Sequence, residues 1–559
     1  MESMHKDLRG CDIVTVYQQS FIDNFPLPAV TDFTTGKTLT YGEMAKHIAR
    51  LHLYFDSIGI QPGDKIALLG KNTSRWIYIF MASLTYGSVI VPILNDFNPV
   101  DATHIINHSD AKLLFVADSI WEQIKDNDFP ALQAVFSLDS VKMLHCYDPA
   151  SDKAFKNLSR RFAKRYPNGF SRTDIIYVPR QNDDVAILNY TSGTTGYSKG
   201  VLLSYDSVAG NVSFTQSLRI HYQGSRALSF LPLAHAYGCA IDMLLPLSVG
   251  THLTILGKAP TPQTILKAMA KVKPTIVISV PLVLEKIYRK MIVPMITKKP
   301  IRWILAVPML DRAIYGRIRA KLVEAFGGQF EEVIIGGAPL NPEVEEFLYR
   351  INFPFTVGYG MTECCPLISY MPSREFVPTS VGRLLPCMEA KIIRENESDP
   401  YGELVVRGQN VMLGYYKNPE ATAAAIDEDG WLHTGDMGTI GGDDGRIIFL
   451  KGRCKTMILS GNGQNIYPEE IEAKFNNMPY VGESLVLDRN GHLEALIYPD
   501  PEAVKNDRLT ERDIIAIMEQ NRRDVNKLVA PYEQIERIEL MQEEFVKTPK
   551  RSIKRFLYS

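Results

Sequence analysis

Short apolar runs alternate with amphipathic stretches through most of the chain, and this alternation limits the possible folds. Residues 65–69 and 88–94 are apolar runs typical of buried strands, and residues 40–53 and 73–82 have the pattern of helices. The same rhythm recurs in further apolar runs, at residues 113–117, 227–231, 275–280 and 333–335. Strand–helix alternation of this kind predicts a parallel sheet covered by helices on both faces.

The pattern changes near Gly402, where shorter strands with glycine turns begin. Residues 403–407 and 445–450 predict a small β-rich subdomain. The last hundred or so residues are more charged and contain two expected strands and an amphipathic helix, at residues 483–487, 493–498 and 511–528. We therefore predict an α/β protein with a large N-terminal domain of parallel or mixed sheets plus the β-rich subdomain, residues 1–452, and a small α+β C-terminal domain, residues 453–559.

Composition excludes several other classes of protein. A net charge of −2 gives no overall field that would attract nucleic acid. No apolar run approaches the ~20 residues of a membrane span, and the first residues lack the apolar core of a signal peptide. Seven cysteines are scattered without metal spacing, so we expect a cytoplasmic protein with free thiols and without structural zinc.

Residues 190–201, YTSGTTGYSKGV, predict a site for an anion, and a nucleotide phosphate fits best. Glycines let the backbone turn tightly and approach a ligand, while hydroxyls, N–H groups and one ammonium converge on it. A solvated linker is the alternative, but a linker has no need of Lys199 between two short apolar runs. The candidate binding residues are Thr191, Ser192, Gly193, Thr194, Thr195, Gly196 and Lys199.

Four further segments follow this loop in a fixed order. They are PLAHAYG at residues 232–238, GYGMTE at 358–363, GWLHTGD at 430–436 and KGRCKTMILSGNGQNIYPEEIE at 451–472. The set resembles the adenylate-forming (AMP-binding) superfamily, from about Asp32 to the C-terminus. Within it, the segments GYGMTECCPLISY and LSGNGQNIYPEEIE look most like those of a bacterial long-chain fatty acid–CoA ligase.

The resemblance implies that ATP activates a medium- or long-chain fatty acid, which is then transferred to CoA. A carboxylate is a poor acylating agent, whereas its mixed anhydride with AMP can be attacked by a thiol. The first step brings a carboxylate to a polyanion, so the site must neutralise charge, with a divalent metal bridging phosphate oxygens. We expect fatty acid, ATP and CoA as partners, and no nucleic acid.

The resemblance implies which residues contact the ATP phosphates and the metal ion. The β- and γ-phosphates would meet Ser192, Thr194, Thr195 and Lys199. Thr362 would reach the α-phosphate, and Glu363, a hard oxygen ligand, would hold Mg²⁺. A surface carboxylate near a turn is the alternative for Glu363.

The nucleoside contacts follow in the same way. Adenine would lie against a turn of small residues, Gly336, Gly337, Ala338 and Pro339. Tyr359, with Gly360 beside it in the site, would stack on the other face of the base, unless it is a core tyrosine. Asp436 would accept hydrogen bonds from the ribose hydroxyls, and Arg453 would meet the same ribose.

The remaining assignments concern the acyl group and CoA. His235 would lie beside the acyl carboxylate, although a lone histidine is more often a packing residue, and residues 235–243 and 361–370 would line an apolar tunnel. Lys455 occupies the hinge position of the family, so the C-terminal domain is expected to rotate between an adenylation pose and a thioester-forming pose. Gly461 would approach the pantetheine arm of CoA in the second pose.

One departure from the family pattern weakens the analogy. In VKTPKRSIKRF, residues 546–556, Ser552 stands where the family has a lysine that reaches the α-phosphate and the carboxylate, and a serine cannot supply that charge. Lys550 or Lys554, two residues to either side, could substitute if the loop shifts. Two other interpretations are that adenylation is slow, or that adenylation proceeds without this lysine.

Two alternatives for function stay open on this basis. The acyl group could pass to carrier-protein phosphopantetheine rather than CoA, or the chain could be a non-catalytic nucleotide- or acyl-binding homologue. The basic stretch at residues 156–172 reads as a solvated helix and loop. A second one, residues 288–310, could rest on the inner face of an anionic bilayer as a peripheral contact, although ordinary packing is the simpler reading.

Overall fold

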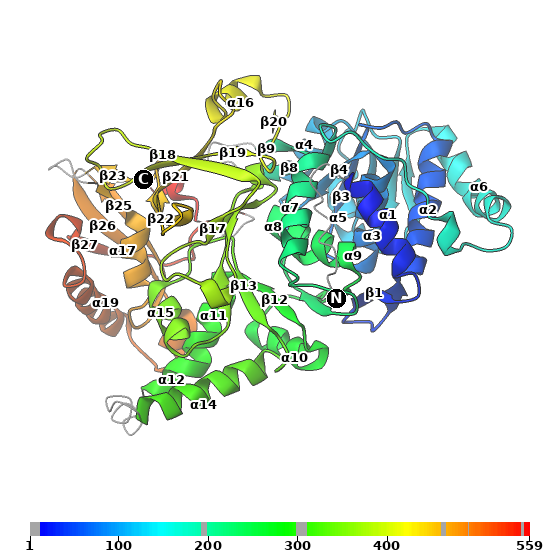
Figure 1. Cartoon of the computed structure of the whole chain (residues 1–559). Coiled ribbons are helices and arrows are strands. Elements are labelled where there is room, and N and C mark those ends of the chain that lie inside the picture. Colours follow the sequence, from blue (N-terminus) through cyan, green and yellow to red (C-terminus); the bar gives the residue numbers. More distant parts are fainter. Residues whose placement is uncertain are drawn as a thin grey trace.

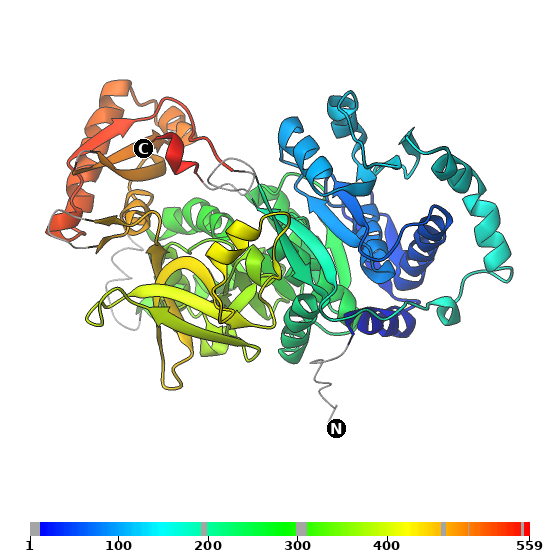
Figure 2. The same ribbon diagram turned by 90° about the horizontal axis from the view of Figure 1, so that it is seen from above.

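The computed structural model describes residues 12–191, 198–297, 310–459, 465–489, 491–548 and 553–558. Within these residues, three large sheets form the main body, and a smaller sheet carries the C-terminal part (Figure 1). Seen from above, the C-terminal part, orange to red, lies at the opposite end of the molecule from helix α6 (Pro149–Arg165; Figure 2).

The first sheet has the strand order β20-β9-β8-β4-β3-β5-β6-β7. The strands are β3 (Lys65–Leu69), β4 (Val89–Ile93), β5 (Ala111–Val116), β6 (Ala134–Ser137), β7 (Met143–Cys146), β8 (Val185–Thr191), β9 (Lys199–Ser204) and β20 (Gly414–Tyr415). Strands β3, β4, β5, β6 and β8 are parallel, and the outer strands β7, β9 and β20 pair antiparallel. The parallel centre confirms the predicted alternation.

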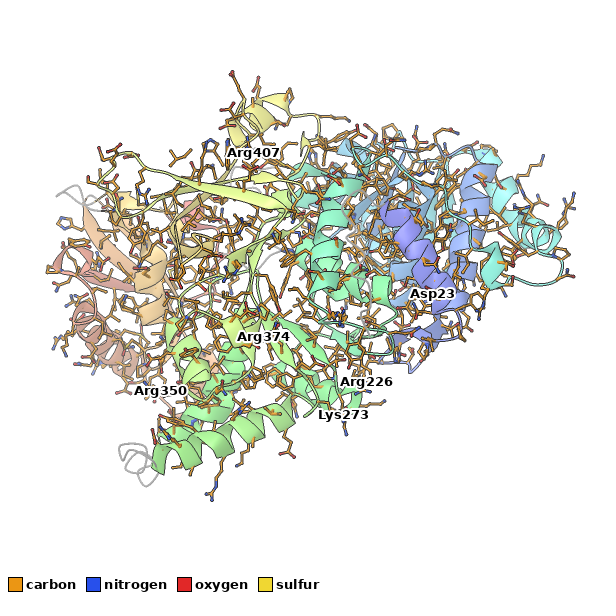
Figure 3. All side chains as sticks on the ribbon, viewed as in Figure 1. Asp23, Arg226, Lys273, Arg350, Arg374 and Arg407 are labelled. Carbon is orange, nitrogen blue, oxygen red and sulfur yellow. The ribbon has the colours of Figure 1, made fainter. Side chains whose placement is uncertain are left out.

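The second sheet is parallel except at one edge, in the order β14-β13-β12-β10-β11-β1-β2. Its strands are β1 (Pro28–Asp32), β2 (Thr38–Thr40), β10 (Arg226–Ser229), β11 (His252–Ile255), β12 (Ile276–Ser279), β13 (Glu332–Ile335) and β14 (Phe355–Val357). At its rim, Arg226 Nε donates to the carbonyls of Val272 and Lys273, each at 3.0 Å, and Figure 3 shows the labelled Arg226 and Lys273 side by side.

The third sheet is antiparallel and corresponds to the predicted β-rich subdomain. Its strands are β15 (Tyr359–Gly360), β16 (Leu367–Tyr370), β17 (Arg383–Leu384), β18 (Met388–Ile393), β19 (Gly402–Gly408), β21 (Leu432–Gly441) and β22 (Ile447–Arg453). It begins at Tyr359 in the GYGMTE segment, well before the predicted start near Gly402, and ends at Arg453, so it carries several of the predicted site residues.

Helices surround the sheets of the main body. They are α1 (Ile13–Asp23), α2 (Tyr41–Ser57), α3 (Ser74–Tyr86), α4 (Pro99–His108), α5 (Asp118–Ile124), α6, α7 (Tyr205–Ser217), α8 (Ala236–Cys239), α9 (Leu245–Val249), α10 (Pro262–Val272), α11 (Pro281–Ile287), α12 (Val293–Ile296), α14 (Leu310–Ala325), α15 (Pro342–Arg350) and α16 (Pro419–Ala425). Helix α2 begins at a capping box, in which Thr40 and Glu43 each bond the other's backbone N–H. It continues four residues past the predicted end because Tyr54 and Phe55 extend its buried face.

The C-terminal part has its own buried cluster, which includes Ile471, Phe475, Val486, Ile497 and Val525. Its elements are β23 (Ile458–Leu459), β24 (Asn465–Ile466), α17 (Pro468–Phe475), β25 (Val481–Arg489), β26 (His492–Pro499), α18 (Pro501–Asn506), α19 (Glu511–Asn526) and β27 (Arg537–Leu540). Among the described residues, no helix is both long and apolar enough to cross a membrane.

Candidate active site

One cleft of about 3840 Å³ brings together all of the predicted site residues that the structure describes. They come from segments far apart in the sequence: Thr191, Lys199, His235, Gly336, Gly337, Ala338, Tyr359, Gly360, Thr362, Glu363, Asp436 and Arg453. The other predicted residues, Ser192, Gly193, Thr194, Thr195, Gly196, Gly461, Lys550 and Ser552, lie outside the described residues.

The predicted phosphate end of the cleft is organised by the β8–β9 pair. Thr191 ends β8 and pairs with Lys199, which begins β9, so both flank the glycine-rich loop. Lys199 Nζ lies 4.8 Å from the ring centroid of Tyr415, and the Tyr415 hydroxyl donates to Glu363 Oε1 at 3.0 Å. Burial raises the pKa of Tyr415, so its hydroxyl stays a donor.

Tyr415 was missed by sequence reasoning because it lies outside the quoted motifs. Its position depends on β20, which pairs antiparallel with β9 and sets Tyr415 opposite Val201. That pairing joins residues more than two hundred positions apart, and no local pattern reports it.

Glu363 fits the role of a magnesium ligand. It lies in the single turn η4 (Thr362–Cys364), and the backbone carbonyl of Glu363 accepts a hydrogen bond from Met412 N at 2.8 Å. The described residues contain no group of three or more His, Cys, Asp or Glu side chains that could hold a metal. A single carboxylate suits Mg²⁺, which binds through one or two carboxylates plus substrate phosphates.

The predicted adenine turn follows β13. Gly337 has φ +87°, a conformation that favours glycine. A Cβ at Gly336 would lie 3.0 Å from the ring of Tyr237, whose hydroxyl donates to Ile334 O at 3.2 Å. Tyr237 belongs to the PLAHAYG segment, so this ring holds that segment against the turn.

The predicted ribose residues meet on the third sheet. Asp436 of β21 and Arg453 of β22 are register partners, and Arg453 Nε lies 2.9 Å from Asp436 Oδ1. The Tyr359 hydroxyl donates to Asp436 Oδ2. Burial raises the pKa of Asp436, and the Arg453 guanidinium opposes this shift.

Glu403 of β19 fixes the turn that presents Asp436, and sequence reasoning missed it. Glu403 Oε1 accepts a hydrogen bond from Gly435 N at 3.0 Å, and Oε2 lies 2.8 Å from His433 Nδ1. Both contacts cross from β19 to β21, so the pairing of these strands is needed to recognise them.

His235 occupies the N-cap position of helix α8 at the cleft and is half-buried. The predicted tunnel segments both reach the cleft wall. The contributors from residues 235–243 are His235, Ala236, Tyr237, Gly238 and Ile241, and those from residues 361–370 are Met361, Thr362, Glu363, Pro366, Leu367 and Tyr370.

The C-terminal part closes one side of the cleft. Lys455, Lys547 and Lys554 line it, and Lys547 and Ile553 form an isolated antiparallel bridge. Lys547 is ion-paired with Glu483 and Glu544.

The second basic stretch contacts the C-terminal part through the residues that are described. Arg289 donates to Asn476 O, and Lys290 Nζ lies 3.1 Å from Glu502 Oε2. Residues 298–309 of this stretch lie outside the described residues.

Comparison with known proteins identifies the family. The model of the AMP-binding enzyme family matches residues 23–416. The chain belongs to this family. The match confirms the resemblance drawn from the five motifs.

Relatives and solved structures agree with this family. The chain is 29% identical over 515 residues to long chain acyl-CoA synthetase 6, peroxisomal, of Arabidopsis thaliana, covering 85% of this chain and 70% of that one. It is 27% identical over 566 residues to the long-chain-fatty-acid–CoA ligase FadD15 of Mycobacterium bovis, covering 92% and 90%.

Two solved structures share the fold. The anthranilate CoA ligase AuaEII with anthranoyl-AMP matches with a TM-score of 0.76 at 18% identity, over 98% of this chain and 96% of that one. A Mycobacterium tuberculosis fatty acyl CoA synthetase matches with a TM-score of 0.66 at 22% identity, over 99% and 98%. Both structural matches extend over the C-terminal part, so the fold is shared there as well.

Proposed function

We propose that this protein is an AMP-forming fatty acid–CoA ligase acting on a medium- or long-chain acid. The cleft that brings the predicted residues together carries this proposal. Relatives named long-chain acyl-CoA synthetases, similar over most of their length, support the same substrate class.

In this proposal ATP lies along the cleft with its phosphates at the β8–β9 turn. Lys199 supplies a positive charge there, and Asp436 with Arg453 holds the ribose while adenine lies against Gly336. Glu363 would hold Mg²⁺, which neutralises charge on the phosphate oxygens when bound. The acyl carboxylate attacks the α-phosphorus and pyrophosphate leaves.

The second step uses the same cleft after the C-terminal domain rotates about Lys455. The CoA thiol attacks the acyl carbon near His235, a thioester forms and AMP leaves. We place the domain boundary at residues 452–453, one residue before β22 ends and ahead of the separate C-terminal cluster.

A panel of acids from acetate to oleate, with AMP release measured with and without CoA, tests the proposal. Fatty-acid-dependent AMP release together with acyl-CoA product is the expected result. Acyl-adenylate without acyl-CoA would favour a carrier-protein acceptor, and no acid-dependent release would favour a non-catalytic binding protein.

A further inference from the structure

The last segment of the chain brings three cations to the cleft wall, Lys547, Lys554 and Arg555. Two of them are already neutralised, because Lys547 is held in two ion pairs and Arg555 donates to both oxygens of Glu472. Lys554 makes no ion pair with any residue that the structure describes. Lys554 therefore brings an uncompensated positive charge to the cleft.

The residue before Lys554 fixes the direction of its side chain. Ile553 forms the antiparallel bridge with Lys547 and packs on a buried cluster that includes residues of β25 and β26. Lys554 N donates to Val546 O at 2.9 Å, so the backbone continues this bridge by one residue. Successive side chains of an extended chain point to opposite faces. Lys554 therefore points away from the cluster and toward the cleft, and it is half-buried there.

Lys554 faces the predicted phosphate end of the cleft. It lines a side pocket of about 380 Å³ together with Asp96, which follows β4 and also lines the main cleft. Ile90 of β4 is level with Ile187 of β8 in this parallel pair, so the loop after β4 begins beside the end of β8. That end of β8 is Thr191, where the glycine-rich loop begins.

We infer that Lys554 is a catalytic residue of adenylation, which brings a cation from the C-terminal part to the oxygens where the carboxylate meets the α-phosphate. Two anions approach each other in this step, and negative charge accumulates on the α-phosphate oxygens as the new bond forms. An ammonium is a compact charge with three N–H donors, so one lysine can contact oxygens of both groups. The inference rests on the proposed function, because it names a cation of that reaction.

The assignment also accounts for Ser552, which cannot supply a charge two residues earlier in the sequence. A different role for Lys554 is to hold the C-terminal part closed by pairing with an acid of the main body or of its own segment. The acids of the side pocket are Asp96, Asp101 and Glu544. The experiment therefore has to separate contact with the substrates from contact with these carboxylates.

Separate assays of the two half-reactions test the assignment. Lys554→Ala should lower fatty-acid-dependent pyrophosphate exchange about 100-fold, the scale of one preorganised electrostatic group. Acyl-CoA formation from supplied acyl-adenylate and CoA should stay near the wild-type rate, because no second anion has to approach the phosphate in that step. Lys554→Arg keeps the charge and should keep part of the exchange.

Two sets of control variants accompany Lys554→Ala. Lys505→Ala removes an exposed lysine of α18 that does not line the cleft, and it should leave both half-reactions unchanged. Asp96→Asn, Asp101→Asn and Glu544→Gln remove the side-pocket charges one at a time, and each should lose far less exchange than Lys554→Ala.

Three results would overturn the inference: near-normal exchange in Lys554→Ala, an equal loss in both half-reactions, or the same loss of exchange in one of the three acid variants. Failure of the proposed function is distinguishable, because the wild type itself would then show no exchange with any acid. That result would overturn both.

Discussion

At the scale of single residues, Tyr415 joins the two sides of the proposed phosphate site. Its ring lies under Lys199, and its hydroxyl bonds Glu363. Tyr415→Phe keeps the ring and removes only the bond that orients the carboxylate. We expect AMP release to fall about 10-fold, or about 1.4 kcal/mol of barrier, with a higher Mg²⁺ requirement.

Tyr416→Phe is the matched control, since the Tyr416 hydroxyl donates to Asp110 Oδ2 at 2.7 Å, away from Glu363. Equal Mg²⁺ dependence in the two variants would contradict the assignment of Tyr415 as a positioning residue.

Asp436 tests the proposed ribose contact. Asp436→Asn loses the charge that pairs with Arg453 and one acceptor oxygen for a diol. We expect ATP to bind roughly 10-fold more weakly by calorimetry, equivalent to about 1.4 kcal/mol. Asp444→Asn, which removes the ion pair with Arg383 on the same sheet, is the control and should leave ATP affinity unchanged.

At the scale of elements, helix α17 depends on a buried pair with the final turn of the chain. Arg555 donates to both oxygens of Glu472, each at 2.6 Å, and Val486 N donates to Oε1 at 2.7 Å. Arg555→Met leaves this carboxyl buried without its cation, so the free energy of unfolding of the C-terminal part should fall by about 3 kcal/mol. Denaturant titration of the full chain measures it.

The pH dependence of this loss follows from the same pair. Burial raises the pKa of Glu472 to about 7, above the value of about 4.3 in an unfolded chain. A raised carboxyl pKa stabilises the fold at low pH, and that stability is lost as pH rises through the folded value. The Arg555→Met loss should therefore be larger at pH 8 than at pH 5.

Arg523→Met is the control, because its exposed pair with Glu519 on α19 should contribute less than ~1 kcal/mol. A pH-independent loss in Arg555→Met would contradict this account of Glu472.

The elements also show how far sequence reasoning reaches. Local patterns located β3, β13 and α19 to within a few residues, because apolar period and caps are local properties. The ordered motifs predicted Asp436 and Arg453 as ribose contacts, and the structure makes them register partners on β21 and β22. Sequence reasoning missed Tyr415 and Glu403. Their contacts depend on strand pairings, of β20 with β9 and of β19 with β21, that local sequence does not encode.

At the scale of the whole molecule, hydrogen bonds and ion pairs of differing exposure join the C-terminal part to the main body. Asn341 Nδ2 donates to Asn477 Oδ1 at 2.7 Å, and the Lys290–Glu502 pair is largely exposed. An exposed ion pair contributes little, so loss of the Lys290–Glu502 pair would oppose rotation about Lys455 only weakly.

Lys455→Pro should restrict that rotation. We expect acid-dependent pyrophosphate exchange to persist while acyl-CoA formation falls at least ~10-fold, or about 1.4 kcal/mol of barrier. Parallel assays of the two half-reactions measure it. An equal fall in both, or none in either, would contradict the rotation.

We propose that the cleft adenylates a fatty carboxylate at a triphosphate held by Lys199 and Glu363. Fatty-acid-dependent exchange of pyrophosphate with ATP reports this half-reaction alone, in the wild type and in Lys199→Ala and Glu363→Ala. We expect exchange in the wild type and a loss of at least ~100-fold in each variant, the scale of one preorganised electrostatic group. No exchange in the wild type with any acid, or near-normal exchange in both variants, would contradict it.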